Sequence, residues 1–128
     1  MSNDMNTFRV DIEIENAARP GERRTVTSVL VETGTVLSWV PAALLESLGI
    51  ERSSTWRFRR ADGTVIERWV GPALAHIAGK RTIDDLVFGE PGDLVLLGSR
   101  TLAGLNLRVE LVTKRLVDAG PAPAAAAA

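Results

Sequence analysis

Short runs of β-forming residues separated by turn residues fill most of the chain, and this pattern constrains the fold more than any other feature. In "FRVDIEIE" (8–15) apolar and polar residues alternate with a period of two, as in a strand with one buried face. Pro20-Gly21 and Asp62-Gly63 are strong turn signals between such runs. Further runs of this kind are 24–31, 35–40, 55–60, 64–79, 82–89, 94–98, 107–112 and 115–117. We therefore expect about seven to nine short strands in a mostly-β domain, a small barrel or sandwich.

Two segments have the pattern of short helices. In "PAALLESLG" (41–49), Pro41 takes the first helical position, three leucines share one face, and Gly49 ends the helix. The second segment, "SRTLAGLN" (99–106), follows "LVLLG" (94–98), a continuous apolar run typical of a strand buried on both faces. The predicted domain thus contains two short helices among its strands.

The composition excludes several classes of protein. The 128 residues are enough for one domain, and the net charge of −1 gives no general attraction to nucleic acid or anionic membranes. Without cysteine there is no disulfide, no thiolate nucleophile and no cysteine-based metal site. No secretory signal and no apolar run of about 20 residues is visible, so we expect a soluble cytoplasmic protein. We assign residues 8–118 to the folded domain, 1–7 to a flexible N-terminus and 119–128 to a disordered Ala/Pro tail.

A single carboxylate lies in the apolar segment "VLVETGTVLSWV" (29–40). Glu32 directly follows a strand pattern and is itself followed by Thr33 and Gly34. An unpaired carboxylate between apolar flanks is costly to bury, and perturbed acids cluster at functional sites. We therefore interpret Glu32 as a functional acid rather than a solvated turn residue. The segment "LVLLGSR" (94–100) is a weak echo of this one, because both are apolar strands that end in a glycine turn and lead toward a short helix.

The order of these pieces resembles the retropepsin-like aspartic proteases, which are single-lobe, homodimeric acid proteases. In that family an apolar strand delivers an Asp-Thr-Gly or Asp-Ser-Gly turn, and a short helix like "VPAALLESLGI" (40–50) follows. A β-hairpin flap comes next, matched by "WRFRRADGTVIERWV" (56–70), and then a second apolar strand ending in Leu-Gly, matched by "LVLLGSRTLAGLNLRVE" (94–110). The resemblance covers residues 8–117 and implies a small closed barrel of the acid-protease type.

The resemblance also implies a reaction and a site. Peptide bonds would be hydrolysed by a water held between two carboxylates, one from each chain of a homodimer, and the substrate would be a peptide or an unfolded protein. The resemblance implies no metal and no other cofactor. The implied site consists of catalytic Glu32, Thr33 and Gly34, the flap residues Ala61, Asp62, Gly63 and Thr64, and the second-strand glycine turn Leu97 and Gly98.

At one position the chain departs from the family's catalytic triplet. It has Glu32 where the family has aspartate, and Thr35 stands where a small residue is usual. Two lengthened side chains crowd each other unless they fold back or the backbones retreat, and a misplacement of about 1 Å can lower a rate by about 10²-fold. The alternative to hydrolysis is a catalytically impaired homologue that acts as a peptide-binding or structural dimeric module. A third alternative is an unrelated, monomeric β-barrel with a chance Glu-Thr-Gly.

The remaining polar and aromatic candidates are interpreted as structural. His76 is the only histidine and has no apparent relay or metal partner in the sequence. Asp84 and Asp85 are neighbours on a strand and are expected to face opposite sides of it. The four flap arginines are interpreted as a solvent-exposed face, with a preference for acidic peptides as the alternative: Arg57, Arg59, Arg60 and Arg68. The three tryptophans, Trp39, Trp56 and Trp69, are interpreted as core or interface anchors, and in the functional interpretation one of them lines a substrate pocket.

Overall fold

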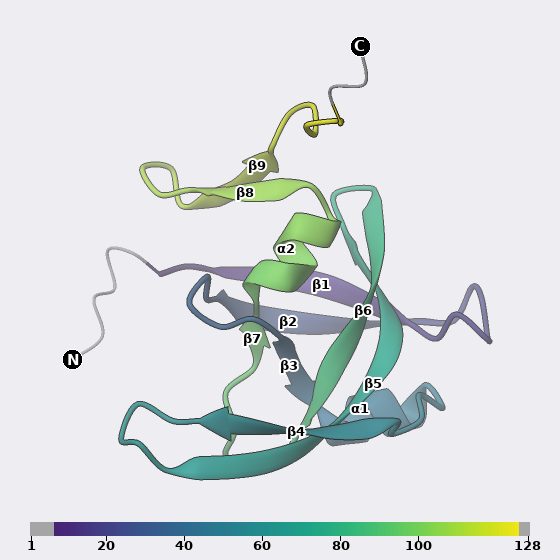
Figure 1. Cartoon of the computed structure of the whole chain (residues 1–128). Coiled ribbons are helices and arrows are strands. Elements are labelled where there is room, and N and C mark those ends of the chain that lie inside the picture. The colour runs from purple at the N-terminus through teal and green to yellow at the C-terminus, as the bar shows by residue number, and fades with distance from the viewer. Residues whose placement is uncertain (1–6, 126–128) are drawn as a thin grey trace.

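The computed structural model describes residues 7–125 and confirms a mostly-β domain with two short helices (Figure 1). None of the helices in this part of the chain is long and apolar enough to cross a membrane. The elements are β1 (Arg9–Glu15), β2 (Arg23–Val31), β3 (Ser38–Pro41), α1 (Ala42–Ser47), β4 (Ser54–Arg59), β5 (Val65–Ile77), β6 (Lys80–Gly89), β7 (Leu96–Leu97), α2 (Ser99–Gly104), β8 (Leu107–Glu110) and β9 (Arg115–Asp118).

The main sheet closes on itself. Its seven strands follow the order β1-β2-β7-β3-β6-β5-β4, and β1 also pairs with β5. The pairings therefore return to β1, and β4 extends outward from β5 as an edge strand. Strands β8 and β9 form a separate two-stranded antiparallel sheet beside α2.

The alternation in the first strand produces its buried face as predicted, with one exception. Ile12 and Ile14 are 1% and 0% exposed, whereas Arg9 and Asp11 face solvent. Glu15 belongs to the predicted polar side, yet it is only 6% exposed. Its carboxylate is buried because residues far along the chain provide partners for it, so local alternation does not fix the burial of every residue.

Three predicted boundaries change. Pro41 is the residue that caps α1, not its first helical residue, and Gly49, with a φ of +73°, follows the helix as its stop. The third strand begins at Ser38, because residues 32–37 form a turn and an irregular segment. The run 94–98 yields only a two-residue strand, and Leu94 is 65% exposed, so the prediction of a strand buried on both faces along this run is wrong.

The two echoed segments lie side by side. Strand β2 pairs with β7 in parallel, with Leu30 opposite Leu96 and Val31 opposite Leu97. Because the strands run in the same direction, both of their following turns emerge at the same edge of the sheet. The structure thereby brings the Glu-Thr-Gly turn next to Gly98.

Two apolar clusters support this arrangement. The larger one fills the interior and includes Val31, Leu97 and Leu102. The smaller one consists of buried Leu37, Trp39, Val70 and Val87, against which Phe58, Ile66 and Leu96 pack. Since Phe58 and Ile66 belong to the hairpin formed by β4 and β5, the second cluster attaches that hairpin to the barrel.

The predictions of a flexible N-terminus and a disordered tail stay predictions. Residues 1–6 and 126–128 lie outside the described residues. Residues 119–125 have no regular secondary structure, but their start is bonded to the domain: Ala119 donates its N–H to the carbonyl of Asn106 at 2.9 Å, and Asn106 Nδ2 donates to the carbonyl of Gly120 at 2.8 Å.

Candidate functional site

The turn after β2 presents the Glu32 carboxylate directly after Val31, the buried last residue of that strand. Val31 is 5% exposed, Glu32 is half-buried, and Thr33 and Gly34 are exposed. The N–H of Thr35 donates to the carbonyl of Glu32 at 3.2 Å, which closes the turn. The acid is therefore fixed at its backbone while its side chain remains accessible to solvent.

The glutamate side chain folds back on its own turn. Glu32 Oε1 accepts a hydrogen bond from the N–H of Gly34 at 2.9 Å. A Cβ added at Gly34 would lie 3.1 Å from the same oxygen, closer than most real Cβ contacts, so a larger residue there would press on the carboxylate. Folding back is one of the two ways in which the extra methylene was expected to be accommodated.

The second apolar segment holds the turn from behind. The N–H of Glu32 donates to the carbonyl of Leu97 at 3.0 Å, and the N–H of Ser99 donates to the carbonyl of Thr35 at 2.8 Å. Gly98 lies so close to residues 36–37 that a Cβ would be 2.7 Å from two of their carbonyl oxygens. Only glycine fits this approach, which explains why the second strand ends in Leu-Gly.

A chain of buried hydroxyl groups joins the two segments. Gly98 donates its N–H to Ser38 Oγ at 2.9 Å, and Ser38 Oγ lies 2.6 Å from Thr101 Oγ1. Thr101 in turn donates to Asp84 Oδ2 at 2.8 Å, and Arg100 Nε lies 3.0 Å from Asp84 Oδ1. Because the proton of Thr101 is used on Asp84, Ser38 donates to Thr101. Each of these polar groups therefore has a partner in a region with almost no solvent.

An open groove begins at this turn and continues under the β4–β5 hairpin. One segment, of about 320 Å³, is lined by residues 34–37 and 56–59 together with Trp39 and Leu96. A second segment, of about 430 Å³, shares Trp39, Phe58, Arg59 and Leu96 with the first. The shared walls make the two segments one groove. Strand β4, which forms one wall, pairs only with β5 in the described chain and leaves its other backbone edge free.

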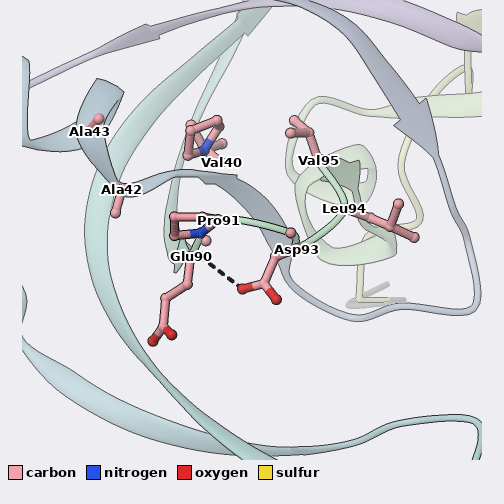
Figure 2. A pocket seen from close by; sticks show the side chains of 11 residues that line it. Val40, Ala42, Ala43, Glu90, Pro91, Asp93, Leu94 and Val95 are labelled. Atoms are coloured by element: carbon pink, nitrogen blue, oxygen red, sulfur yellow. Dashed lines mark hydrogen bonds between the residues drawn. The ribbon is translucent and has the colours of Figure 1, made fainter.

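A partly buried ion pair fixes the hairpin to the loop before β7. Arg68 Nε and Nη2 donate to Asp93 Oδ2 and Oδ1 at 2.7 and 3.0 Å, and the two side chains are 12% and 8% exposed. Asp93 also accepts from the backbone N–H of Glu90 at 2.8 Å, and Figure 2 shows its carboxylate turned back toward that residue. Hydrogen bonding by Arg68 lowers the pKa of Asp93 below its ordinary value of 3.8.

The predicted site residues fall into two groups. Glu32, Thr33 and Gly34 lie beside Leu97 and Gly98, as described above. The predicted flap residues form the tip of the hairpin, where all four are exposed: Ala61, Asp62, Gly63 and Thr64. They do not line the groove in this single chain; residues 56–59 of the same hairpin line it instead. This wall was not predicted from the sequence, although strand alternation places Trp56 and Phe58 on one face and is the signal that could have indicated it.

The residues interpreted as structural have specific partners. His76 Nε2 lies 2.7 Å from Glu15 Oε1, and a hydrogen bond from the N–H of Gly21, followed by that of His76, lowers the pKa of Glu15. Asp84 is buried and Asp85 half-buried, but Arg100 contacts both. Among residues 7–125 no three His, Cys, Asp or Glu side chains gather in a way that could hold a metal ion.

The flap arginines and the tryptophans do not all fit one interpretation. Arg57, Arg59 and Arg60 are exposed as expected, whereas Arg68 is largely buried by its pairing with Asp93. Trp39 is a core residue at 8% exposure. The tryptophans of the hairpin are not core residues, because Trp56 and Trp69 are 38% and 47% exposed.

Comparisons with known proteins find similarity among solved structures but not among sequences. No protein-family model matches the sequence, and no similar sequence is found among curated proteins. Among solved structures, the chain is similar to the protease of simian foamy virus (mac), determined in solution, with 20% sequence identity and a TM-score of 0.49. The similarity covers 74% of this chain and 91% of that chain.

The buried hydroxyl chain predicts the effect of removing one of its members. Thr101→Val keeps the shape of the side chain but leaves Asp84 Oδ2 without a donor and the proton of the Ser38 hydroxyl without an acceptor. We expect the free energy of unfolding to fall by about 1–3 kcal/mol, measured by urea denaturation at pH 7. Thr55→Val, at an exposed position of β4, is the matched control and should change it by less than about 0.5 kcal/mol. Equal effects of the two substitutions would contradict a stabilising role for the chain.

The ion pair of the hairpin predicts a pH dependence. Because the pKa of Asp93 is lower in the folded than in the unfolded protein, its contribution is complete above the ordinary pKa and is lost as the pH falls through the lowered one. Asp93→Asn should reduce the free energy of unfolding by about 2 kcal/mol at pH 7, and the difference from wild type should shrink below about pH 4.

Urea denaturation at a series of pH values between 2.5 and 7 measures this difference. Glu67→Gln, at an exposed position of β5, is the control and should give a nearly constant, small difference. A difference between wild type and Asp93→Asn that stays constant down to pH 2.5 would show that the lowered pKa does not stabilise the fold.

Proposed function

We propose that this protein is an aspartic-type endopeptidase of the retropepsin-like kind, in which two copies of Glu32 form the catalytic pair of a homodimer. The observation that carries the proposal is the placement of Glu32. Glu32 directly follows Val31, the buried last residue of β2, its turn is bonded to the parallel second strand at Leu97, and an open groove starts at the same turn. A merely solvated turn residue would not need the buried support that this turn has.

The chemistry requires a second carboxylate. A water positioned between two acids is activated when one acid accepts its proton and the other donates a proton to the substrate carbonyl. Two carboxylates in contact share a proton, because both cannot ionise together, and they titrate as a unit. The chain offers one Glu-Thr-Gly turn, so a two-fold axis next to Glu32 supplies the other acid.

The shape of the chain favours a partner on one side. The turn after β2, the β4–β5 turn and the β8–β9 turn all reach the left side of the molecule in Figure 1. At the β8–β9 turn, Leu111 and Val112 are 52% and 92% exposed. A second copy placed on this side would meet the Glu32 turn and cover these apolar side chains, which explains their exposure in a single chain.

The groove fits an extended peptide. Its wall, β4, has a free backbone edge, to which a peptide strand can add by main-chain hydrogen bonds. The other wall begins at Gly34 and Thr35, directly after the acid. A peptide bound in this manner passes the carboxylate, with the tip of the hairpin, residues 61–64, able to close over it.

The test of the proposal is the loss of hydrolysis on neutralising Glu32. Wild type should cleave denatured casein within the range pH 3–7, and Glu32→Gln, which keeps the shape and the hydrogen-bond acceptor for Gly34, should be slower by about 10³-fold or more. Product peptides are quantified by mass spectrometry. Glu32→Asp keeps the carboxylate and is the matched variant; it should retain cleavage above the level of Glu32→Gln.

The second candidate function is a dimeric peptide-binding module without turnover. The hydrogen bond from Gly34 to Glu32 favours it, because a carboxylate oxygen committed to its own turn is less available to a water. If wild type does not cleave but binds casein peptides, and Glu32→Asp gains hydrolysis, this second function holds. Equal cleavage by wild type and Glu32→Gln would remove Glu32 from the mechanism altogether.

The dimer makes a separate prediction at the β8–β9 turn. Val112→Asp places a charge on each of two symmetric contacts, so the dissociation constant of the dimer should rise by about 100-fold. Sedimentation equilibrium over a range of protein concentrations measures this shift. Since Val112 is 92% exposed in the single chain, circular dichroism should show an unchanged fold.

The matched control is Ile83→Asp. Ile83 is 65% exposed on β6, at a position outside the β8–β9 turn, so this substitution should leave the dimer intact. A wild-type chain that stays monomeric at all concentrations, or an Ile83→Asp variant that dissociates as readily as Val112→Asp, would contradict this interface.

A further inference from the structure

One buried polar atom in the groove has no partner. Trp39 is 8% exposed, and its indole Nε1 is the only buried side-chain nitrogen or oxygen atom of the described chain without a hydrogen bond. An unpaired buried donor costs free energy, and such donors are uncommon in native proteins. An indole N–H can only donate, so it requires an acceptor.

No atom of the described chain accepts a hydrogen bond from the indole N–H of Trp39. Its cluster consists of Leu37, Val70 and Val87, with Phe58, Ile66 and Leu96 packed against it, all of them apolar. Trp39 itself lines both segments of the groove under the β4–β5 hairpin. The groove is therefore the place from which an acceptor can reach the indole.

We propose that Trp39 is a specificity-determining residue that donates a hydrogen bond from Nε1 to an oxygen-bearing side chain of the peptide in the groove. The proposal rests on the proposed function, since it names the kind of substrate that the same site takes. The groove is also lined by the charged residues Arg59, Arg60 and Asp93, but the side chains that pack against the cluster of Trp39 include Phe58 and Leu96. Between these two apolar side chains a neutral acceptor is favoured, because a carboxylate placed there would pay a large cost of desolvation. An amide side chain, as in asparagine, supplies the acceptor without a charge.

Access to the indole depends on the hairpin. Phe58, on edge strand β4, packs on Trp39 with the ring centroids 4.8 Å apart. A small outward shift of β4 uncovers the indole, while Arg68 and Asp93 keep β5 attached to the barrel. Binding of a side chain at this point thus replaces the contact with Phe58 and gives the buried N–H its partner.

Asparagine and leucine have nearly the same shape, so they isolate the hydrogen bond. Decapeptide pools are prepared in which one position is fixed as asparagine or leucine and the others are randomised, and their cleavage is followed by mass spectrometry. With wild type, one position relative to the cleaved bond should favour asparagine over leucine by about tenfold. In Trp39→Phe, which keeps an aromatic ring but lacks the donor, this ratio should fall to about one.

Trp69→Phe is the matched control and should keep the wild-type ratio, because Trp69 lines neither segment of the groove. Thermal unfolding of both variants shows whether they are folded. A ratio that is the same in Trp39→Phe and wild type, or the absence of any position that favours asparagine, would overturn the proposal. Equal losses for both residues would also overturn it, since the indole would then bind the peptide backbone or only support the fold.

A binding measurement separates this proposal from the proposed function. In ¹⁵N-labelled Glu32→Gln protein, the indole N–H signal that disappears in Trp39→Phe is assigned to Trp39. That signal should shift with the asparagine pools and not with the leucine pools, whether or not wild type cleaves peptides. If wild type cleaves no peptide but the signal shifts selectively, the proposed hydrolysis is contradicted and the role of Trp39 is supported. If both pools shift the signal equally, or neither shifts it, the role of Trp39 is contradicted.

Discussion

The candidate site depends on one buried chain of hydrogen bonds, which runs from the N–H of Gly98 through the hydroxyls of Ser38 and Thr101 to Asp84. Each hydroxyl both donates and accepts, so the chain has one direction and ends on a carboxylate that Arg100 neutralises. In a region of low dielectric, such bonds reinforce one another, and none can be lost without leaving a buried group unpaired. The chain fixes Gly98 against Ser38, and the backbone bonds from Glu32 to Leu97 and from Ser99 to Thr35 add the turn of Glu32 to this fixed unit.

The order of the elements was predictable from the sequence because it follows from local signals. Alternation in 8–15 and the Asp62-Gly63 turn depend only on neighbouring residues. Local signals could not predict contacts between distant residues. Ser38 and Thr101 are 63 positions apart in the sequence, and His76 and Glu15 are 61 apart. The contact with His76 accompanies the burial of the Glu15 carboxylate, which the alternation had placed on the solvent side. The exposure of Leu94 has a similar origin, since an apolar run is buried only where other elements cover it.

The β4–β5 hairpin combines a fixed base with a free edge. Arg68 and Asp93 tie β5 to the loop before β7, and Val70 lies in the small apolar cluster with Trp39. Strand β4 is held mainly by β5 and by Phe58, and the tip at 61–64 is exposed. Of the four arginines that looked alike in the sequence, Arg68 is the anchor. It lies opposite Trp56 in the β-pairing and is 2.7 Å from Asp93 with a side chain only 12% exposed, whereas Arg60 approaches Asp93 at 3.9 Å and is 52% exposed.

The extra methylene of Glu32 does not simply extend the carboxylate farther from the turn, because the side chain folds back. Because Oε1 accepts the N–H of Gly34, part of the side chain's length is used within its own turn. In the dimer proposed above, the folded side chain would reach less far toward the two-fold axis than an extended glutamate, so two copies would crowd each other less than a comparison with aspartate implies. The same bond occupies Oε1, and no hydrogen bond within the described chain involves Oε2. Any residue larger than glycine at position 34 would disturb this arrangement, since its Cβ would lie 3.1 Å from the bonded oxygen. The glycine of the triplet therefore sets the position of the acid as well as the path of the backbone.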